Sequence, residues 1–227
     1  MANLVIFDID GTLVNSVEID TICFVRSIKE EFGIHHIDER WETYRNVTDS
    51  GVLEEILEKT FARKPSESEI RRHVRRFLNL LEVYYSRDRT LLRVITGAQD
   101  IVKRLKNDPE WKIGIATGAW RESALFKLKA AGIDIKGIPI VTSSEAKSRE
   151  DILRKCIDDS KGHYGVNEFR KIVSVGDGIW DLEAANKLGI GFVGINVPEK
   201  NDDFADYKTL KNYGEQRKFM GYLEEAD

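Results

Sequence analysis

Two carboxylates stand directly after the first apolar segment of the chain. Residues 4–7, Leu-Val-Ile-Phe, run into Asp8 and Asp10, and the pair Gly11-Thr12 lies just beyond Asp10. Burying carboxylates is costly unless a metal ion, a proton or hydrogen bonds offset the charge. The stretch therefore indicates either a solvent-exposed turn or a site at which the two carboxylates hold something.

Similar transitions from apolar to polar residues recur along the chain. The short apolar runs lie at 4–7, 112–116, 138–141, 171–175 and 191–195. Such runs are typical of strands buried on both faces, as in a parallel sheet. Segments with helical periodicity separate them; one has Leu125, Leu128 and Ala131 on its apolar face. This alternation predicts a doubly wound, mainly parallel α/β sheet.

The ends of the predicted strands carry most of the chemically interesting side chains. In open α/β sheets, ligands bind beyond the carboxyl ends of the strands, so residues at these positions share one edge of the sheet. Besides the two carboxylates at 8 and 10, this edge would hold Thr117, the Gly118 amide, Lys147, Asp177 and Asp181. Four carboxylates, a hydroxyl and an ammonium are thus expected to lie close together.

This set of groups suits phosphoryl transfer. Asp8, Asp10 and Asp177 offer hard oxygen ligands for a small octahedral ion such as Mg²⁺. Lys147 and Thr117 can bind non-bridging phosphate oxygens, one by charge and one by hydrogen bond. A carboxylate beside the metal can act as a nucleophile and form an aspartyl-phosphate. A second carboxyl group can donate a proton to the leaving alcohol, which contributes about 10²–10⁴-fold to the rate.

Residues 16–93 break the alternation of strands and helices. We expect helices over 17–32, over part of 38–47 and near 52–61, followed by a helix that opens with a capping box at Ser66 and Glu69. The sequence therefore predicts an all-helical domain of residues 16–93, inserted into an α/β core domain formed by residues 1–15 and 94–227.

The motifs resemble those of the haloacid dehalogenase superfamily. Residues 8–14, Asp-Ile-Asp-Gly-Thr-Leu-Val, resemble its first motif, residues 115–118 its second, Lys147 its third, and residues 176–181 its fourth. The helical insert resembles the small cap of the branch that includes phosphoglycolate phosphatase and β-phosphoglucomutase. The resemblance implies a Rossmann-like core with this cap placed after the first motif.

The resemblance also implies roles for the site residues. Asp8 would be the nucleophile and Asp10 the general acid/base, with the Asp10 backbone carbonyl rather than its carboxylate on the metal ion. Asp177 would be the other metal ligand besides Asp8 and Asp10, and Asp181 would orient Lys147 or a metal-bound water. True dehalogenases lack an acid at position 10, because halide leaves without a proton.

The phosphoryl group would be held by Thr117 and Lys147, assisted by the amides of Ile9 and Gly118. Arg45, Thr48 and Trp180 are candidates for substrate specificity, since the first two lie on the loop by which such caps reach the substrate and Trp180 lies within the fourth motif.

The function expected from these residues is a Mg²⁺-dependent phosphatase that hydrolyses a small phosphate monoester through an aspartyl-phosphate. A phosphomutase of the β-phosphoglucomutase type uses the same core and stays open. So does a different class, a phospho-accepting regulatory module or a non-catalytic binding protein, although neither needs a large insert or the acid at position 10.

Composition and charge limit the kinds of partner that the protein is expected to bind. The net charge of −4 argues against a protein that coats nucleic acid, and 41% hydrophobic residues are enough for a sizeable core. No apolar run approaches the length of a membrane-spanning helix. We expect a cytoplasmic protein whose partner is a small phosphorylated metabolite rather than nucleic acid or a membrane, with the oligomeric state open.

Overall fold

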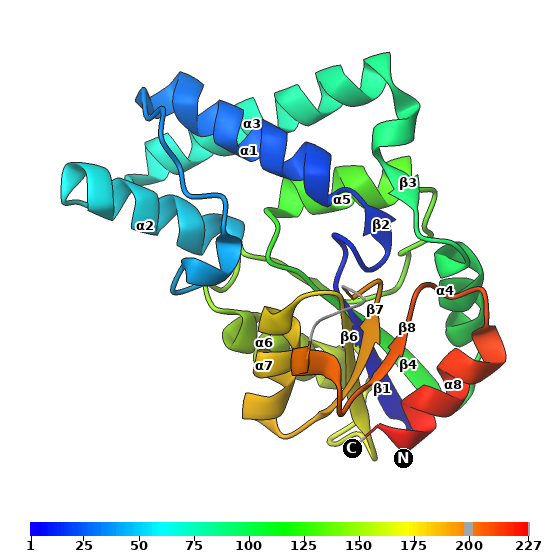
Figure 1. The fold of residues 1–227 in the computed structure, drawn as a ribbon. Helices are drawn as coiled ribbons and strands as arrows, with labels where there is room; N and C mark the ends of the chain where they lie inside the picture. Colours follow the sequence, from blue (N-terminus) through cyan, green and yellow to red (C-terminus); the bar gives the residue numbers. More distant parts are fainter. Residues whose placement is uncertain (198–201, 227) are drawn as a thin grey trace.

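A six-stranded sheet forms the centre of the computed structural model, which describes residues 1–197 and 202–226 (Figure 1). Its order is β5-β4-β1-β6-β7-β8, and every neighbouring pair is parallel. The strands are β1 (Asn3–Phe7), β4 (Trp111–Ala116), β5 (Ile140–Val141), β6 (Ile172–Gly176), β7 (Gly191–Ile195) and β8 (Lys208–Leu210). The predicted doubly wound α/β fold is confirmed.

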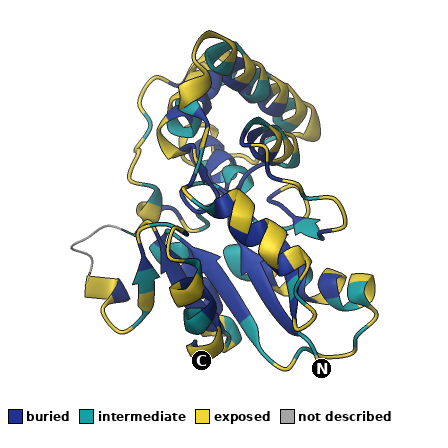
Figure 2. Ribbon diagram, turned by 90° about the vertical axis from the view of Figure 1, so that its right-hand side faces the viewer, coloured by how far each residue is buried: buried dark blue, intermediate teal, exposed yellow. Residues whose placement is uncertain are grey.

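Helices cover both faces of this sheet. They are α4 (Ala98–Lys106), α5 (Arg121–Ala130), α6 (Arg149–Tyr164), α7 (Ile179–Leu188) and α8 (Gln216–Glu225). Alternate residues of a strand point to opposite faces, and β1 follows this rule. Leu4 and Ile6 pack with residues of α6, whereas Val5 and Phe7 belong to the core on the other face. Figure 2 shows the central strands buried between helices whose outer surfaces are exposed.

Residues 16–93, called the helical insert below, lie over the carboxyl end of the sheet (Figure 1). Its helices are α1 (Val17–Phe32), α2 (Asp49–Phe61) and α3 (Glu67–Arg87), with 3₁₀ turns at Trp41–Thr43 and Arg89–Leu91. The chain enters and leaves the insert through two short antiparallel strands, β2 (Val14–Asn15) and β3 (Arg93–Val94), in which Asn15 pairs with Arg93.

Local sequence signals explain most helix ends of the insert. Gly33 ends α1 in the left-handed conformation, and Ser66 opens α3 with the expected capping box. The helix expected over part of 38–47 is only a 3₁₀ turn. The Asp38 carboxylate accepts hydrogen bonds from the Arg40 amide and guanidinium, so side-chain bonds compete with helical ones there.

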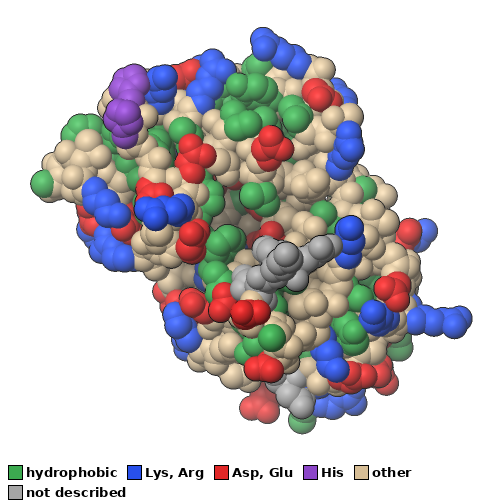
Figure 3. All heavy atoms as spheres, viewed as in Figure 1, with side chains coloured by type: hydrophobic (Ala, Val, Ile, Leu, Met, Phe, Trp, Pro, Cys, Tyr) green, Lys and Arg blue, Asp and Glu red, His purple; other side chains and the backbone are tan. Residues whose placement is uncertain are grey.

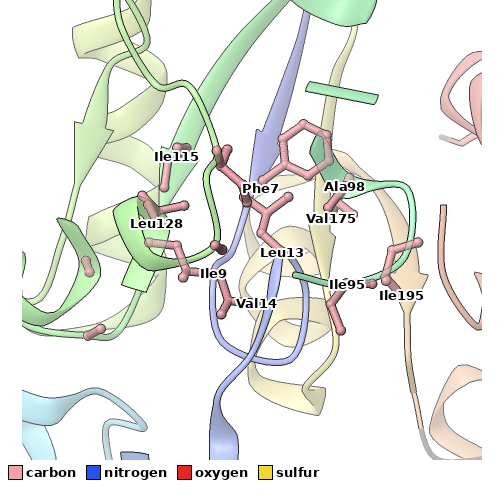
Figure 4. Close-up of a cluster of buried hydrophobic side chains, with 14 of the residues drawn as sticks. Phe7, Ile9, Leu13, Val14, Ile95, Ala98, Ile115, Leu128, Val175 and Ile195 are labelled. Atoms are coloured by element: carbon pink, nitrogen blue, oxygen red, sulfur yellow. The ribbon is translucent and has the colours of Figure 1, made fainter. Parts of the chain in front are cut away.

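The loop after β1 is anchored by apolar side chains. Ile9, Leu13 and Val14 are fully buried beside Phe7 of the strand, in a cluster that also contains Ile95, Ala98, Ile115, Leu128, Val175 and Ile195 (Figure 4). Because Ile9 is held in the core, its neighbours Asp8 and Asp10 are fixed on a rigid turn. None of the helices in the described part of the chain has the length and apolar character needed to span a membrane.

Candidate active site

A tight turn brings the loop after β1 against Asp177. Gly11 has φ = +74°, and a Cβ added to it would lie 1.8 Å from Oδ2 of Asp177. Glycine is the residue that tolerates both the positive φ and the close approach. Asp177 follows β6, the direct neighbour of β1, so the parallel register delivers both carboxylates to one edge of the sheet.

Three carboxylates form the acidic centre of this edge. One oxygen from each of Asp8, Asp177 and Asp181 lies within 4.8 Å of the others. Burial, followed by repulsion from Asp181, raises the pKa of Asp8 to about 7, and burial with repulsion from Asp8 raises the pKa of Asp177 well above its usual value. Buried carboxylates that repel one another are the donor set that a hard cation stabilises, so these residues fit a metal ion.

The two oxygens of Asp181 are already engaged. Oδ1 accepts a hydrogen bond of 3.0 Å from Arg149, and Oδ2 accepts one of 3.3 Å from the Gly178 amide. Asp181 lies next to Asp8 and Asp177, as predicted, and the cation that it orients in this structure is Arg149.

Arg149 is the cation beside the candidate nucleophile. Its Nη1 donates to Oδ1 of Asp8 at 3.1 Å and its Nε to the Val47 carbonyl at 2.8 Å. The side chain is 16% exposed, and the guanidinium lies over the ring of Trp180 at 5.9 Å. Gly118 makes room for it, because a Cβ there would lie 2.7 Å from the guanidinium carbon.

Lys147, the predicted phosphate-binding cation, lies elsewhere. Its Nζ is 2.5 Å from the Glu54 carboxylate of α2, and its side chain is 45% exposed. Ser148 caps α6 by accepting from the Asp151 amide, so Lys147 precedes the cap and Arg149 is the first helical residue. The two side chains leave the chain in different directions for this reason, and the structure brings Arg149, not Lys147, to Asp8.

The remaining predicted phosphate-binding groups meet at the same edge. Thr117 is buried at the end of β4, and its hydroxyl accepts from the Ala119 amide at 3.2 Å. Gly118 lines the cavity described below. The Ile9 amide hydrogen-bonds the Asp8 carboxylate and favours its ionised form.

Asp10 belongs to a second charged group, which the sequence did not reveal. Its Oδ2 accepts from Nζ of Lys127 at 2.6 Å, and its Oδ1 accepts from the Ser16 hydroxyl. Lys127 also donates to Asp20 of α1 at 2.7 Å. Burial raises the pKa of Asp20 to about 6. Burial alone would lower the pKa of Lys127, but attraction to Asp10 and Asp20 outweighs this effect, so the pKa of Lys127 is raised.

The carboxylates of Asp8, Asp10, Asp20 and Asp177 and the Arg149 guanidinium line a cavity of about 140 Å³ between the sheet and the helical insert. Figure 3 shows the surface hollowed between these two parts of the molecule. The acidic residues are joined there by apolar and aromatic side chains of the insert. The lining residues are Asp8, Asp10, Val17, Asp20, Thr21, Phe24, Trp41, Val47, Thr48, Asp49, Val52, Gly118, Ala119, Arg149, Asp177 and Trp180.

Two of the three predicted specificity residues line this cavity. Thr48 and Trp180 do so, whereas Arg45 does not. The Arg45 side chain is 65% exposed and pairs with Glu55 and Glu58 of α2, which draws it away from the site.

The segment of residues 47–49 joins the insert to the core at the mouth of the cavity. The Thr48 hydroxyl donates to the Lys147 carbonyl at 2.7 Å, and the Asp49 amide donates to the Gly118 carbonyl at 2.8 Å. The Asp49 carboxylate accepts from the Trp120 amide at 2.8 Å, at the start of α5. The insert is therefore bonded directly to the loops that hold the candidate catalytic groups.

The family model of the haloacid dehalogenase-like hydrolases matches residues 5–195, which include the motifs after β1, β4 and β6. The chain belongs to this family. A haloacid dehalogenase-like hydrolase is an enzyme, and the cavity with its charged edge is its candidate active site. A comparison with curated proteins found no significant match.

Solved structures of this family share the fold. A candidate β-phosphoglucomutase from Bacteroides vulgatus is 14% identical with a TM-score of 0.70, covering 99% of this chain and 89% of that one. CbbY from Rhodobacter sphaeroides in complex with phosphate is 18% identical with a TM-score of 0.68, covering 95% and 96%. A predicted phosphoglycolate phosphatase from Haemophilus somnus is 18% identical with a TM-score of 0.64, covering 96% and 98%.

Proposed function

We propose that this haloacid dehalogenase-like hydrolase is a Mg²⁺-dependent phosphatase acting on a small phosphate monoester. One observation carries the proposal: Asp8 belongs to an acidic centre that fits a cation and also contacts the Arg149 guanidinium, and Asp10 lies two residues away at the same cavity. A bound cation and the guanidinium together would hold a phosphate in front of the Asp8 carboxylate.

The proposed reaction has two steps. In the first, Asp8 attacks phosphorus, the bond to the leaving oxygen breaks, and Asp10 donates its proton to that oxygen. In the second, Asp10 takes a proton from water, which attacks the aspartyl-phosphate and releases inorganic phosphate. Asp8, Asp177 and the Asp10 carbonyl would hold Mg²⁺, which would neutralise charge on the phosphate and the carboxylates when bound.

The other groups stabilise the transferring phosphoryl group. Arg149 replaces its contact with Asp8 by contacts with phosphate oxygens, assisted by the Thr117 hydroxyl and the amides of Ile9 and Gly118. Such donors act where charge lies in the transition state, which is where electrostatic catalysis is most effective. The helical insert is a cap in this proposal, because residues 47–49 bond it to these loops at the mouth of the cavity, where it would limit the access of water.

A turnover assay tests the function directly. The protein is incubated with p-nitrophenyl phosphate, with Mg²⁺ and with EDTA, and both nitrophenol and inorganic phosphate are measured. Multiple turnovers that need Mg²⁺ and release phosphate support the phosphatase. A single stable phosphorylation of the protein would instead indicate a phospho-accepting module, and transfer to an added sugar phosphate without phosphate release would indicate a phosphomutase.

Asp177→Asn is expected to raise the Mg²⁺ concentration needed for half-maximal activity by at least about 10-fold, because it removes one of the few charged ligands of the ion. The measurement is a Mg²⁺ titration of activity, joined by a titration of the melting temperature. Asp100→Asn, on the exposed surface of α4, is the matched control. An unchanged titration in Asp177→Asn would place the ion elsewhere.

The cavity is expected to discriminate against substrates with a second acidic group. Among the described residues that line it, Arg149 is the only cation, and the proposal assigns it to the phosphate. The insert contributes Asp20 and Asp49, whose carboxylates, when ionised, repel a second anionic group. Phosphoglycolate should therefore have a kcat/KM at least about 10-fold below that of 2-hydroxyethyl phosphate, which has the same number of carbons and nearly the same size without the second charge.

The same comparison in Asp49→Asn separates charge from shape. Burial raises the pKa of Asp49, so the comparison is made at alkaline pH, where the wild type carries the charge. The asparagine keeps an oxygen for the Trp120 amide but cannot ionise, so the gap between the two substrates should narrow. A wild-type preference for phosphoglycolate would show that a cation reaches the leaving group, and the charge argument would then fail.

A further inference from the structure

One buried cation has no part in the mechanism above. Lys127 lies on α5, its side chain is fully buried, and its Nζ contacts Asp10 at 2.6 Å and Asp20 at 2.7 Å. These contacts link three separate elements: the loop after β1, helix α1 of the insert and helix α5 of the core.

Packing alone does not account for a lysine at this position. Removing an ammonium group from water is costly, and a protein with an apolar side chain of similar size in such a place is often as stable or more stable. The neighbouring buried positions of the same helix face are small or apolar, for example Ala124 and Leu128. A charge buried beside the candidate acid/base therefore points to a role in the reaction.

Lys127 fixes one of the two oxygens of Asp10, and Ser16 fixes the other. A carboxylate oxygen has two acceptor sites, so each oxygen keeps one for the cavity, which Asp10 lines. A general acid works only when its proton-bearing oxygen lies within hydrogen-bond distance of the leaving group. Two fixed contacts prevent the carboxyl group from turning away from that position.

Asp20 completes the arrangement. When Asp10 carries its proton, Lys127 remains paired with Asp20. When the proton has moved to the leaving oxygen, the ammonium also pairs with the new carboxylate at Asp10. The lysine is therefore never left as an unpaired buried charge during the reaction cycle, which would be costly.

We propose that Lys127 is the positioning residue of the acid/base: its ammonium, held by Asp20, orients the Asp10 carboxyl group toward the leaving oxygen. The inference rests on the proposed phosphatase function. In the step concerned, the bond from Asp8 to phosphorus forms, the bond from phosphorus to the leaving oxygen breaks, and the proton passes from Asp10 to that oxygen.

The test is how strongly the loss of kcat/KM depends on the leaving group. A lysine with only a structural role would lower kcat/KM equally for good and poor leaving groups. Nitrophenolate leaves readily without a proton, whereas the ethoxide of ethyl phosphate needs one. In Lys127→Met, the loss of kcat/KM on ethyl phosphate should exceed the loss on p-nitrophenyl phosphate by at least about 10-fold, since proton donation contributes about 10²–10⁴-fold. Asp10→Asn should show the same pattern, and combining both changes should add little to it.

Two further variants make the test decisive. Lys106→Met removes a lysine that pairs with Asp134 far from the cavity, and should leave both substrates unaffected. If Lys127→Met fails to fold, the double change Lys127→Met/Asp20→Asn, which removes the ion pair as a unit, takes its place in the same comparison.

Equal losses on the two substrates, or no loss on either, would overturn the role of Lys127 while leaving the phosphatase intact. A wild-type protein that hydrolyses neither substrate would instead overturn the proposed function itself. The wild-type rates therefore separate the failure of one proposal from the failure of the other.

Discussion

Asp8→Asn is expected to lower steady-state phosphatase turnover by at least about 10⁴-fold, because the amide cannot form the acyl phosphate on which both steps depend. The loss should be similar for good and poor leaving groups, since no proton donor replaces a missing nucleophile. The measurement is phosphate release under saturating substrate and Mg²⁺. Retained steady-state hydrolysis would remove Asp8 from the nucleophile role.

The same variant should fold, and without metal it should be more stable than the wild type at pH 8. The folded-state pKa of Asp8 is raised to about 7 by burial and by Asp181, above its ordinary value of 3.8. The folded protein therefore binds more protons than the unfolded chain between these pH values, and stability falls as the pH rises through this window. The substituted asparagine carries no such charge, so a melting curve in EDTA at pH 8 should shift upward.

Arg149→Met is expected to lower kcat/KM by about 10²–10³-fold, the loss typical of removing one preorganised donor from a developing charge. Arg149 contacts Asp8 at 3.1 Å and is the cation nearest the candidate nucleophile among the described residues that line the cavity. Arg149→Lys should recover only part of the activity. The planar guanidinium of arginine can bind the Val47 carbonyl and a phosphate at the same time, and an ammonium cannot reproduce this geometry.

Lys147→Met is the matched control for this prediction. It removes a cation two residues away whose ammonium is bonded to Glu54 rather than to the site, so activity should change by less than about 3-fold. The opposite result, a severe loss in Lys147→Met and a mild one in Arg149→Met, would show that the helical insert moves and that Lys147 reaches the phosphate in the working enzyme.

The contrast between these two residues shows where sequence reasoning reaches its limit. The sequence predicts that the carboxylates at 8, 10, 177 and 181 lie close together, because the strand ends of a parallel sheet share one edge. The direction of a long side chain depends instead on where the next helix begins. Ser148 caps α6, so residue 149 is the first residue of the helix and contacts Asp8, whereas residue 147 precedes the cap and pairs with Glu54.

The role of Lys127 could not be predicted from the sequence, for a different reason. The periodicity of α5 suggested Leu125, Leu128 and Ala131 as its apolar face, but Leu125 is 39% exposed and Lys127 is fully buried. The helical insert covers the part of α5 that carries Lys127, and its partner Asp20 comes from α1. A contact between elements more than a hundred residues apart leaves no local pattern, so neither the buried lysine nor its acidic partners could be read from spacing alone.

The pairing of Asn15 with Arg93 has a consequence for how such an enzyme can diversify. Both connections to the insert pass through the paired strands β2 and β3, while the candidate nucleophile Asp8, the candidate acid/base Asp10 and Arg149 belong to the core. Replacing the residues between Asn15 and Arg93 by another helical segment would change the part of the cavity that the insert lines and leave Asp8, Asp10 and Arg149 in place. Selectivity could thus change by exchange of the insert, provided that the new segment restores the contacts with the core at residues 47–49 and the ion pair from α1 to Lys127.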